Sequence, residues 1–91
     1  MINLYRESSP ALLRDIADSI ERSRAEGLRQ AAHSLKSASA NLGATRLADL
    51  CKTLEDLGRS GDLEPAVELQ PTLREEYEAV IGALERELEQ A

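Results

Sequence analysis

Leucine and alanine recur every three or four residues along most of the chain, and this spacing is the feature that most constrains the fold. Apolar residues at that spacing form one stripe on an α-helix. Leu and Ala supply most of the apolar surface, whereas the β-branched and aromatic residues that favour strands are scarce, with no Phe, no Trp and two Tyr. The sequence therefore predicts an all-α protein.

The first two helices are predicted from their end signals. The first is expected to begin at Ser9-Pro10, an N-cap residue followed by proline at the first helical position. Its apolar pattern is interrupted at Glu26-Gly27, which predicts the boundary with the second helix. The second helix is expected to end at Gly43.

Two further helices complete the chain. The third is expected to stop in GRSGD, a loop that contains Gly58 and Gly61, and the fourth contains Pro71, which predicts a kink or a short separate turn before the main helix. Four amphipathic helices with short loops predict an antiparallel up-down four-helix bundle, a single domain over residues 1–91. The four apolar stripes are Leu13, Ile16, Ala17 and Ile20; Leu28, Ala31, Ala32, Leu35, Ser39 and Leu42; Leu47, Leu50, Cys51, Leu54 and Leu57; and Ala66, Leu69, Leu73, Tyr77, Val80, Ile81, Leu84 and Leu88.

Composition excludes several classes of function. The net charge is −6, from 11 basic and 17 acidic residues, which argues against nucleic-acid binding. No apolar run reaches the roughly 18 residues needed to span a bilayer, and no signal peptide is visible. The single cysteine, Cys51, cannot form an internal disulfide. We expect a soluble, cytoplasmic, monomeric protein that inserts in no membrane, either free or as a module of a larger protein.

The only histidine, His33, is predicted to face away from the core. On a helical wheel the apolar residues of the second stripe cluster within about 40° of one direction, and His33 lies about 140° from Leu28. Small residues flank it on the outer face and leave room for another protein to approach closely. The residues expected to contact such a partner are Arg29, Ser34, Ser37, Ala40 and Asn41.

The segment around His33 also lacks acidic residues. Residues 27–48 contain no Asp or Glu, where the average acidic content of the chain would place about four, but they retain Arg29, Lys36 and Arg46. We expect a neutral or positive local field that accommodates an anion and disfavours a cation. The alternative is that the small residues only permit tight helix packing and that the missing acids are due to chance.

The chain lacks the residues that most catalytic and metal-binding sites require. A bundle with only two aromatic residues has little material for the walls of a serine-hydrolase pocket. One His and one Cys on different helices do not make a zinc site, and GRSG lacks the ending of a phosphate-binding P-loop. The remaining candidate is an exposed, neutral imidazole that acts as a nucleophile, with the Lys36 cation one turn away. A histidine that accepts a phosphoryl group from another protein meets this description.

The segment AHSLKSASANLGATRLADLCKTLEDLGRSG, residues 32–61, resembles the histidine-containing phosphotransfer (HPt) domains of multistep phosphorelays. In that family the phosphohistidine is followed by x-L-K-G-S/A-S/A, then by L-G-A, and then by a Cys-containing helix that ends in L-E-x-L-G-R. The resemblance covers about a third of the chain without gaps. It implies a four-helix bundle in which Leu42, Gly43 and Ala44 form the central turn and Cys51 lies in the core.

The resemblance also implies roles for individual residues. His33 is the expected phosphoacceptor, and Lys36 is the cation near the phosphoryl group. Glu55 occupies the position of a polar partner that orients the imidazole, and Arg59 can add positive charge beside the site. One position departs from the pattern, because Ser37 replaces the usual glycine. We expect this change to have a modest effect on partner affinity or choice.

The hypothesis is a phosphotransfer module without kinase activity of its own. It would accept phosphate from the aspartyl phosphate of a receiver domain and pass it to another receiver, with a hybrid histidine kinase among its partners. It would be either free or a module of a larger protein such as a hybrid histidine kinase. It would need no cofactor, since Mg²⁺ belongs to the receiver. The alternatives are a helical adaptor or dimerisation bundle with an incidental histidine and, less well supported, the dimerisation part of a histidine kinase. That part usually has an acidic residue after the histidine, where this chain has Ser34.

Overall fold

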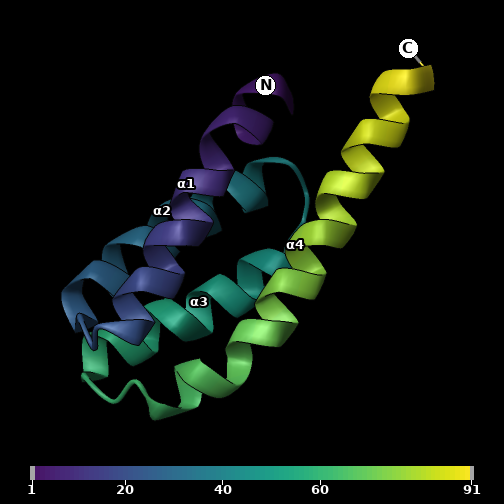
Figure 1. Ribbon diagram of the computed structural model, residues 1–91. Helices are drawn as coiled ribbons and strands as arrows, with labels where there is room; N and C mark the ends of the chain where they lie inside the picture. Colours follow the sequence, from purple (N-terminus) through teal and green to yellow (C-terminus); the bar gives the residue numbers. More distant parts are fainter. Residues whose placement is uncertain (1, 91) are drawn as a thin grey trace.

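The computed structural model describes the backbone of residues 2–90 and the side chains of residues 3–88, and it contains four α-helices. They are α1 (Ile2–Glu21), α2 (Ala25–Asn41), α3 (Thr45–Ser60) and α4 (Glu64–Gln90). The connections lie at alternate ends of the molecule, so that consecutive helices are antiparallel (Figure 1). The predicted all-α, up-down bundle is confirmed.

The helices form a closed ring of neighbours. In the described part of the chain α1 packs on α2, α2 on α3, α3 on α4, and α4 returns to α1, while no Cα atoms of the diagonal pairs lie within 8 Å of each other. The molecule measures 43 × 19 × 19 Å, and its length matches that of α4, whose 27 residues rise about 1.5 Å each. None of the helices described is both long enough and apolar enough to cross a membrane.

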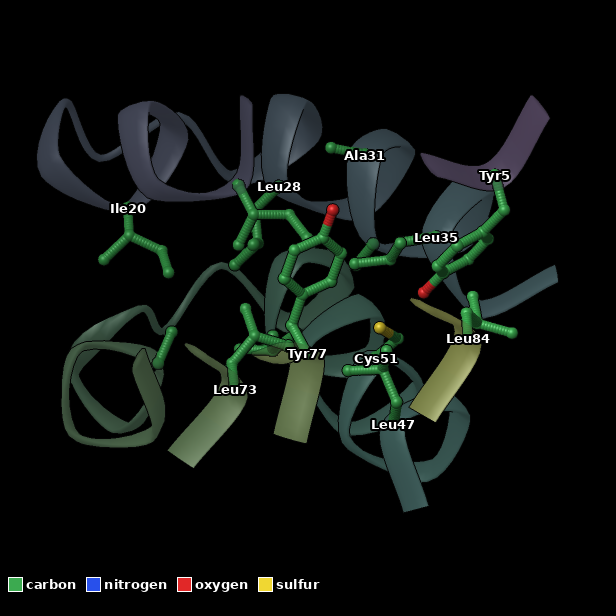
Figure 2. Packing of buried hydrophobic residues seen from close by; sticks show 14 residues of the cluster. Tyr5, Ile20, Leu28, Ala31, Leu35, Leu47, Cys51, Leu73, Tyr77 and Leu84 are labelled. Carbon is green, nitrogen blue, oxygen red and sulfur yellow. The ribbon is translucent and has the colours of Figure 1, made fainter. Parts of the chain in front are cut away.

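The core follows the four predicted stripes except at Leu88, which is 37% exposed, and the described polar groups inside the core are paired. Tyr5 enters it from α1 and Tyr77 from α4 (Figure 2). The Tyr5 hydroxyl lies 3.0 Å from Ser39 Oγ, and Tyr77 Oη lies 2.7 Å from Ser9 Oγ, so these hydrogen bonds join α1 to α2 and to α4. Cys51 is fully buried, as predicted, and burial raises the pKa of its thiol to about 12.

The predicted start of the first helix is wrong. α1 already runs through Ser9 and Pro10, and it begins at Ile2. Ser9 is buried and bonded to Tyr77, so its hydroxyl does not cap a helix. A proline inside a helix removes a single backbone donor. The buried contacts of Tyr5 and Ser9 on the preceding turns hold those turns helical.

The break predicted at Glu26-Gly27 is also misplaced. The chain turns at residues 22–24, where Ser23 has a left-handed φ of 55°, and Glu26 and Gly27 already belong to α2. The end predicted near Gly43 is correct to within two residues, because α2 ends at Asn41 and Gly43 has a φ of 79° in the short turn before α3. The turn implied by the resemblance is thus present.

Two expectations about the second half of the chain need correction or refinement. Gly58 is not in a loop, since α3 continues to Ser60. The helix is capped by Gly61, which has a left-handed φ of 86° and donates a hydrogen bond from its N–H to the carbonyl of Leu57. Pro71 lies inside α4, which is continuous across it. The separate turn proposed as one possibility is therefore absent from the described residues, and Figure 1 shows α4 bending within its first turns.

Candidate functional site

His33 lies on the outer face of α2, as the helical wheel predicts. Its side chain is 56% exposed, whereas Leu28, Ala32 and Leu35 on the opposite face of the same helix are completely buried. Lys36, one turn further along, is partly buried with a side chain that is 30% exposed. Both residues come from one helix, so their spacing is a consequence of helical geometry alone.

Glu55 joins this pair from the neighbouring helix, α3. Its side chain is only 5% exposed, although it carries a charge. One carboxylate oxygen, Oε2, lies 2.9 Å from His33 Nδ1, and the other, Oε1, accepts a hydrogen bond of 2.7 Å from Lys36 Nζ. Arg59, one turn further along α3, approaches Oε2 at 3.4 Å. A buried carboxylate is tolerated when its charge is paired in this way.

The carboxylate fixes the tautomer of His33. The hydrogen bond from Lys36 is the main influence that holds the pKa of Glu55 below its ordinary value, against the opposing effect of burial, and the bond to His33 contributes in the same direction. An ionised carboxylate can only accept hydrogen bonds, so Nδ1 must carry the proton. In the neutral ring Nε2 therefore keeps its lone pair and is the nitrogen available to react.

The charge around His33 is more balanced than the sequence suggests. The acid-free segment 27–48 predicts a neutral or positive field, but the fold brings the Glu55 carboxylate to the histidine from outside that segment. Lys36 and Arg59 supply two positive charges against it. Arg59 also lies 3.5 Å from a carboxylate oxygen of Asp56, so the two cations face two carboxylates and the local charge is near neutral.

Arg29 lies one turn before His33 but is engaged elsewhere. Its Nε donates a hydrogen bond of 2.8 Å to Oε1 of Glu26, and its Nη2 pairs with the other carboxylate oxygen. These bonds lower the pKa of Glu26 to about 2. The structure therefore places Arg29 beside the site with its guanidinium held by a surface carboxylate, a pairing that the sequence analysis missed although the spacing of three residues allows it.

The small residues predicted to receive a partner are exposed. Ser34, Ser37, Ala40 and Asn41 all lie at the surface of α2. Ser34 also lines an open groove between α1 and α2, together with Leu12 and Ala31. Within the described part of the chain, no three His, Cys, Asp or Glu side chains are placed to hold a metal ion. The accessible features of the site are thus the imidazole, the exposed small residues of α2 and the groove beside them.

Comparison with known proteins places this geometry in context. The family model described as the Hpt domain matches residues 1–83. Among solved structures, the chain is similar to that of histidine-containing phosphotransfer protein B (HptB) from Pseudomonas aeruginosa PAO1, with 31% sequence identity and a TM-score of 0.94. That match covers 99% of this chain and 78% of the other. No curated protein matches the chain. Both matches span the segment that contains His33 and Glu55.

Proposed function

Because the chain belongs to the Hpt domain family and is a histidine phosphotransfer module, we propose that His33 is its phosphoacceptor and that phosphate passes between receiver domains through this residue. The observation that carries the proposal is the exposed imidazole whose Nδ1 is held by the buried carboxylate of Glu55. His33 is also the only histidine of the chain.

The transfer step follows from the tautomer. The lone pair of Nε2 attacks the phosphorus of the aspartyl phosphate, a P–N bond forms, and the P–O bond breaks with its electron pair leaving on the receiver's carboxylate. No proton has to leave the attacking nitrogen. The ring keeps its proton on Nδ1 and becomes positively charged, and the carboxylate of Glu55, 2.9 Å away, stabilises that charge. Transfer to a second receiver is the same step in reverse.

The cations are proposed to act on the phosphoryl group. Lys36 Nζ is hydrogen-bonded to Glu55 and remains 30% exposed, so it can share its three donors between the carboxylate and the phosphoryl oxygens. Arg59 is 62% exposed and adds positive charge from α3. We propose that the module needs no cofactor of its own and that Mg²⁺ is held by the receiver.

The proposed partner surface is the exposed small-residue face of α2 with the adjoining groove on α1. A receiver domain presents an acidic site that must approach within bonding distance of Nε2, and the small side chains of Ser34, Ser37 and Ala40 leave that approach open. Arg29 lies at the edge of this face. We expect one of the receivers to belong to a hybrid histidine kinase, and we expect the module itself to be monomeric.

The test is transfer of radioactive phosphate from a phosphorylated receiver domain. We expect label on the wild-type protein that is labile in acid and stable in base, and no label on His33→Gln. A far-ultraviolet circular dichroism spectrum would establish that His33→Gln is folded, because the side chain is mostly exposed and its loss should not disturb the bundle. Label that persists in His33→Gln would refute the role of His33. Absence of label from every receiver tried would favour the helical adaptor.

A further inference from the structure

Gly58 marks the place where the backbones of α2 and α3 touch. A Cβ atom at this position would lie 2.7 Å from the amide nitrogen of Arg29, 2.8 Å from the carbonyl oxygen of Ala25 and 3.0 Å from the Cα of Arg29. All three are backbone atoms of α2, and none can be moved by a side-chain rotation. Only a residue without a side chain allows the two helices to come this close.

Other helical glycines in the chain differ from Gly58 in this respect. At Gly27 the closest neighbour of an added Cβ is the hydroxyl of Ser19, at 2.7 Å, which belongs to a side chain. At Gly82 the nearest atom is 3.6 Å away, an ordinary van der Waals contact with the end of Arg86. Gly58 is thus the helical glycine at which the position of a neighbouring backbone depends on the missing side chain.

This contact lies directly beside the functional site. Along α2, Arg29 precedes His33 by four residues, and along α3, Glu55 precedes Gly58 by three. Because α2 and α3 are antiparallel (Figure 1), the contact Arg29–Gly58 and the contact His33–Glu55 lie one helical turn apart along the same interface. The separation of the helices at Gly58 therefore sets the distance between His33 and Glu55.

We propose that Gly58 is a positioning residue for phosphotransfer: its lack of a side chain keeps α3 close enough to α2 for Glu55 to hold Nδ1 of His33. The catalytic consequence rests on the function proposed above, whereas the geometric claim does not. To bring a Cβ at position 58 from 2.7 Å to an ordinary contact of 3.4 Å, the helices must separate by about 0.7 Å.

The same separation would break the hydrogen bond at the site. It would lengthen the distance from His33 Nδ1 to Glu55 from 2.9 Å to about 3.6 Å, beyond the range of a hydrogen bond. Lys36 also lies on α2, so its bond to the carboxylate would be stretched in parallel. Arg59 lies on α3 and would move with Glu55, so the carboxylate would be left with the arginine as its partner.

The test compares Gly58→Ala with Gly82→Ala, the same substitution within a helix but without a close contact. The first readout is the ¹⁵N spectrum of the His33 ring in the unphosphorylated protein, at a pH where the ring is neutral. We expect the Nδ1–H form in the wild type and in Gly82→Ala, and a shift of population toward Nε2–H in Gly58→Ala. The second readout is the rate of phosphotransfer from a phosphorylated receiver, which should fall about 10- to 100-fold in Gly58→Ala only.

Glu55→Asp provides a second route to the same displacement. It withdraws the carboxylate from α2 by one methylene group while leaving the helix contact at Gly58 intact, and it should produce the same change of tautomer. If Gly58→Ala fails to fold, this variant still tests the step on which the proposal depends, the link between the position of the carboxylate and the tautomer of His33. A wild-type spectrum in either Gly58→Ala or Glu55→Asp would overturn the proposal. If the wild-type protein accepts no phosphate, the proposed function fails, but the ring spectra still decide whether Gly58 positions Glu55.

Discussion

Replacing Glu55 by glutamine isolates the contribution of one buried charge to this bundle. The substitution keeps the shape of the side chain but exchanges one acceptor oxygen for an amide donor. In the wild type Oε1 accepts from Lys36, while Oε2 faces both His33 and Arg59. The single oxygen of glutamine can serve only one of these two sides, and its NH₂ group must face a donor on the other side.

The expected loss of stability follows from the exposure of the partners. Hydrogen bonds to charged groups contribute about 1.5–3 kcal/mol each when both partners are buried. Here the side chains of His33 and Arg59 are more than half exposed and that of Lys36 is 30% exposed, so water can replace part of what is lost. We therefore expect Glu55→Gln to lower the free energy of unfolding by about 1–3 kcal/mol, with a fall in melting temperature of about 4–8 °C for each kcal/mol.

The effect should depend on pH in a defined direction. The pKa of Glu55 lies below its ordinary value of 4.5 in the folded protein, chiefly because of the hydrogen bond from Lys36. A carboxyl group of this kind stabilises the fold fully above its unfolded pKa, and its contribution disappears as the pH falls through the folded value. The stability deficit of the Glu55→Gln variant relative to its parent should be constant above about pH 5.5 and should shrink below pH 4.5.

Urea unfolding followed by circular dichroism provides the assay. Both proteins in the pH series should carry His33→Gln, so that the difference between them reports Glu55 and not the histidine. Glu78→Gln, at an exposed position of α4, is the matched control and should change stability by no more than about 0.5 kcal/mol. The reasoning is refuted if Glu55→Gln loses no more than this control, or if its deficit is as large at pH 3 as at pH 7.

Three further predictions concern the core and α4. Tyr77→Phe should lower the free energy of unfolding by about 1–3 kcal/mol, because it leaves the buried Ser9 hydroxyl without its partner at 2.7 Å. Adding Ser9→Ala in a double-mutant cycle should recover part of this loss, and strictly additive losses would contradict the coupling. Cys51, fully buried with a pKa of about 12, should react with a disulfide reagent at least about 100-fold more slowly in the folded protein than in guanidinium chloride, and equal rates would show that the core is open. Pro71→Ala should raise the urea midpoint by restoring a helical donor at an exposed position, with a gain of about 1–3 kcal/mol, and an unchanged or lower midpoint would show that the packing of α4 requires the proline.

Much of the fold could be predicted because helical periodicity is a local property. The stripe that includes Leu28 and Leu35 fixes which side of α2 is buried, and the outward direction of His33 follows from the same wheel. The helix ends are harder to predict, since proline is compatible with either the start of a helix or its interior. Pro10 lies within α1 because buried contacts of the preceding turns outweigh the local signal at Ser9.

The interior glycine shows the same limit. The residue type of Gly58 predicts a loop, although Leu47, Cys51 and Leu54 continue to it at helical spacing and favour a helix. Near the end of a helix these two local signals conflict, and the structure shows that the spacing is the better guide here. Neither signal indicates that a neighbouring backbone lies 2.7 Å from the position of the missing Cβ, because that depends on how two helices cross.

The helices, the exposure of His33 and its spacing from Lys36 can all be read from the amino-acid sequence, because each depends on the geometry of a single helix. The position of Glu55, 22 residues from His33, cannot be read in this way, since its burial and the contact of its carboxylate with Nδ1 arise when α3 packs on α2. A glutamate at this point of α3 would be solvated if the helix stood alone. The crossing of α2 and α3 at Gly58 removes it from water, and the cations around it make that burial tolerable.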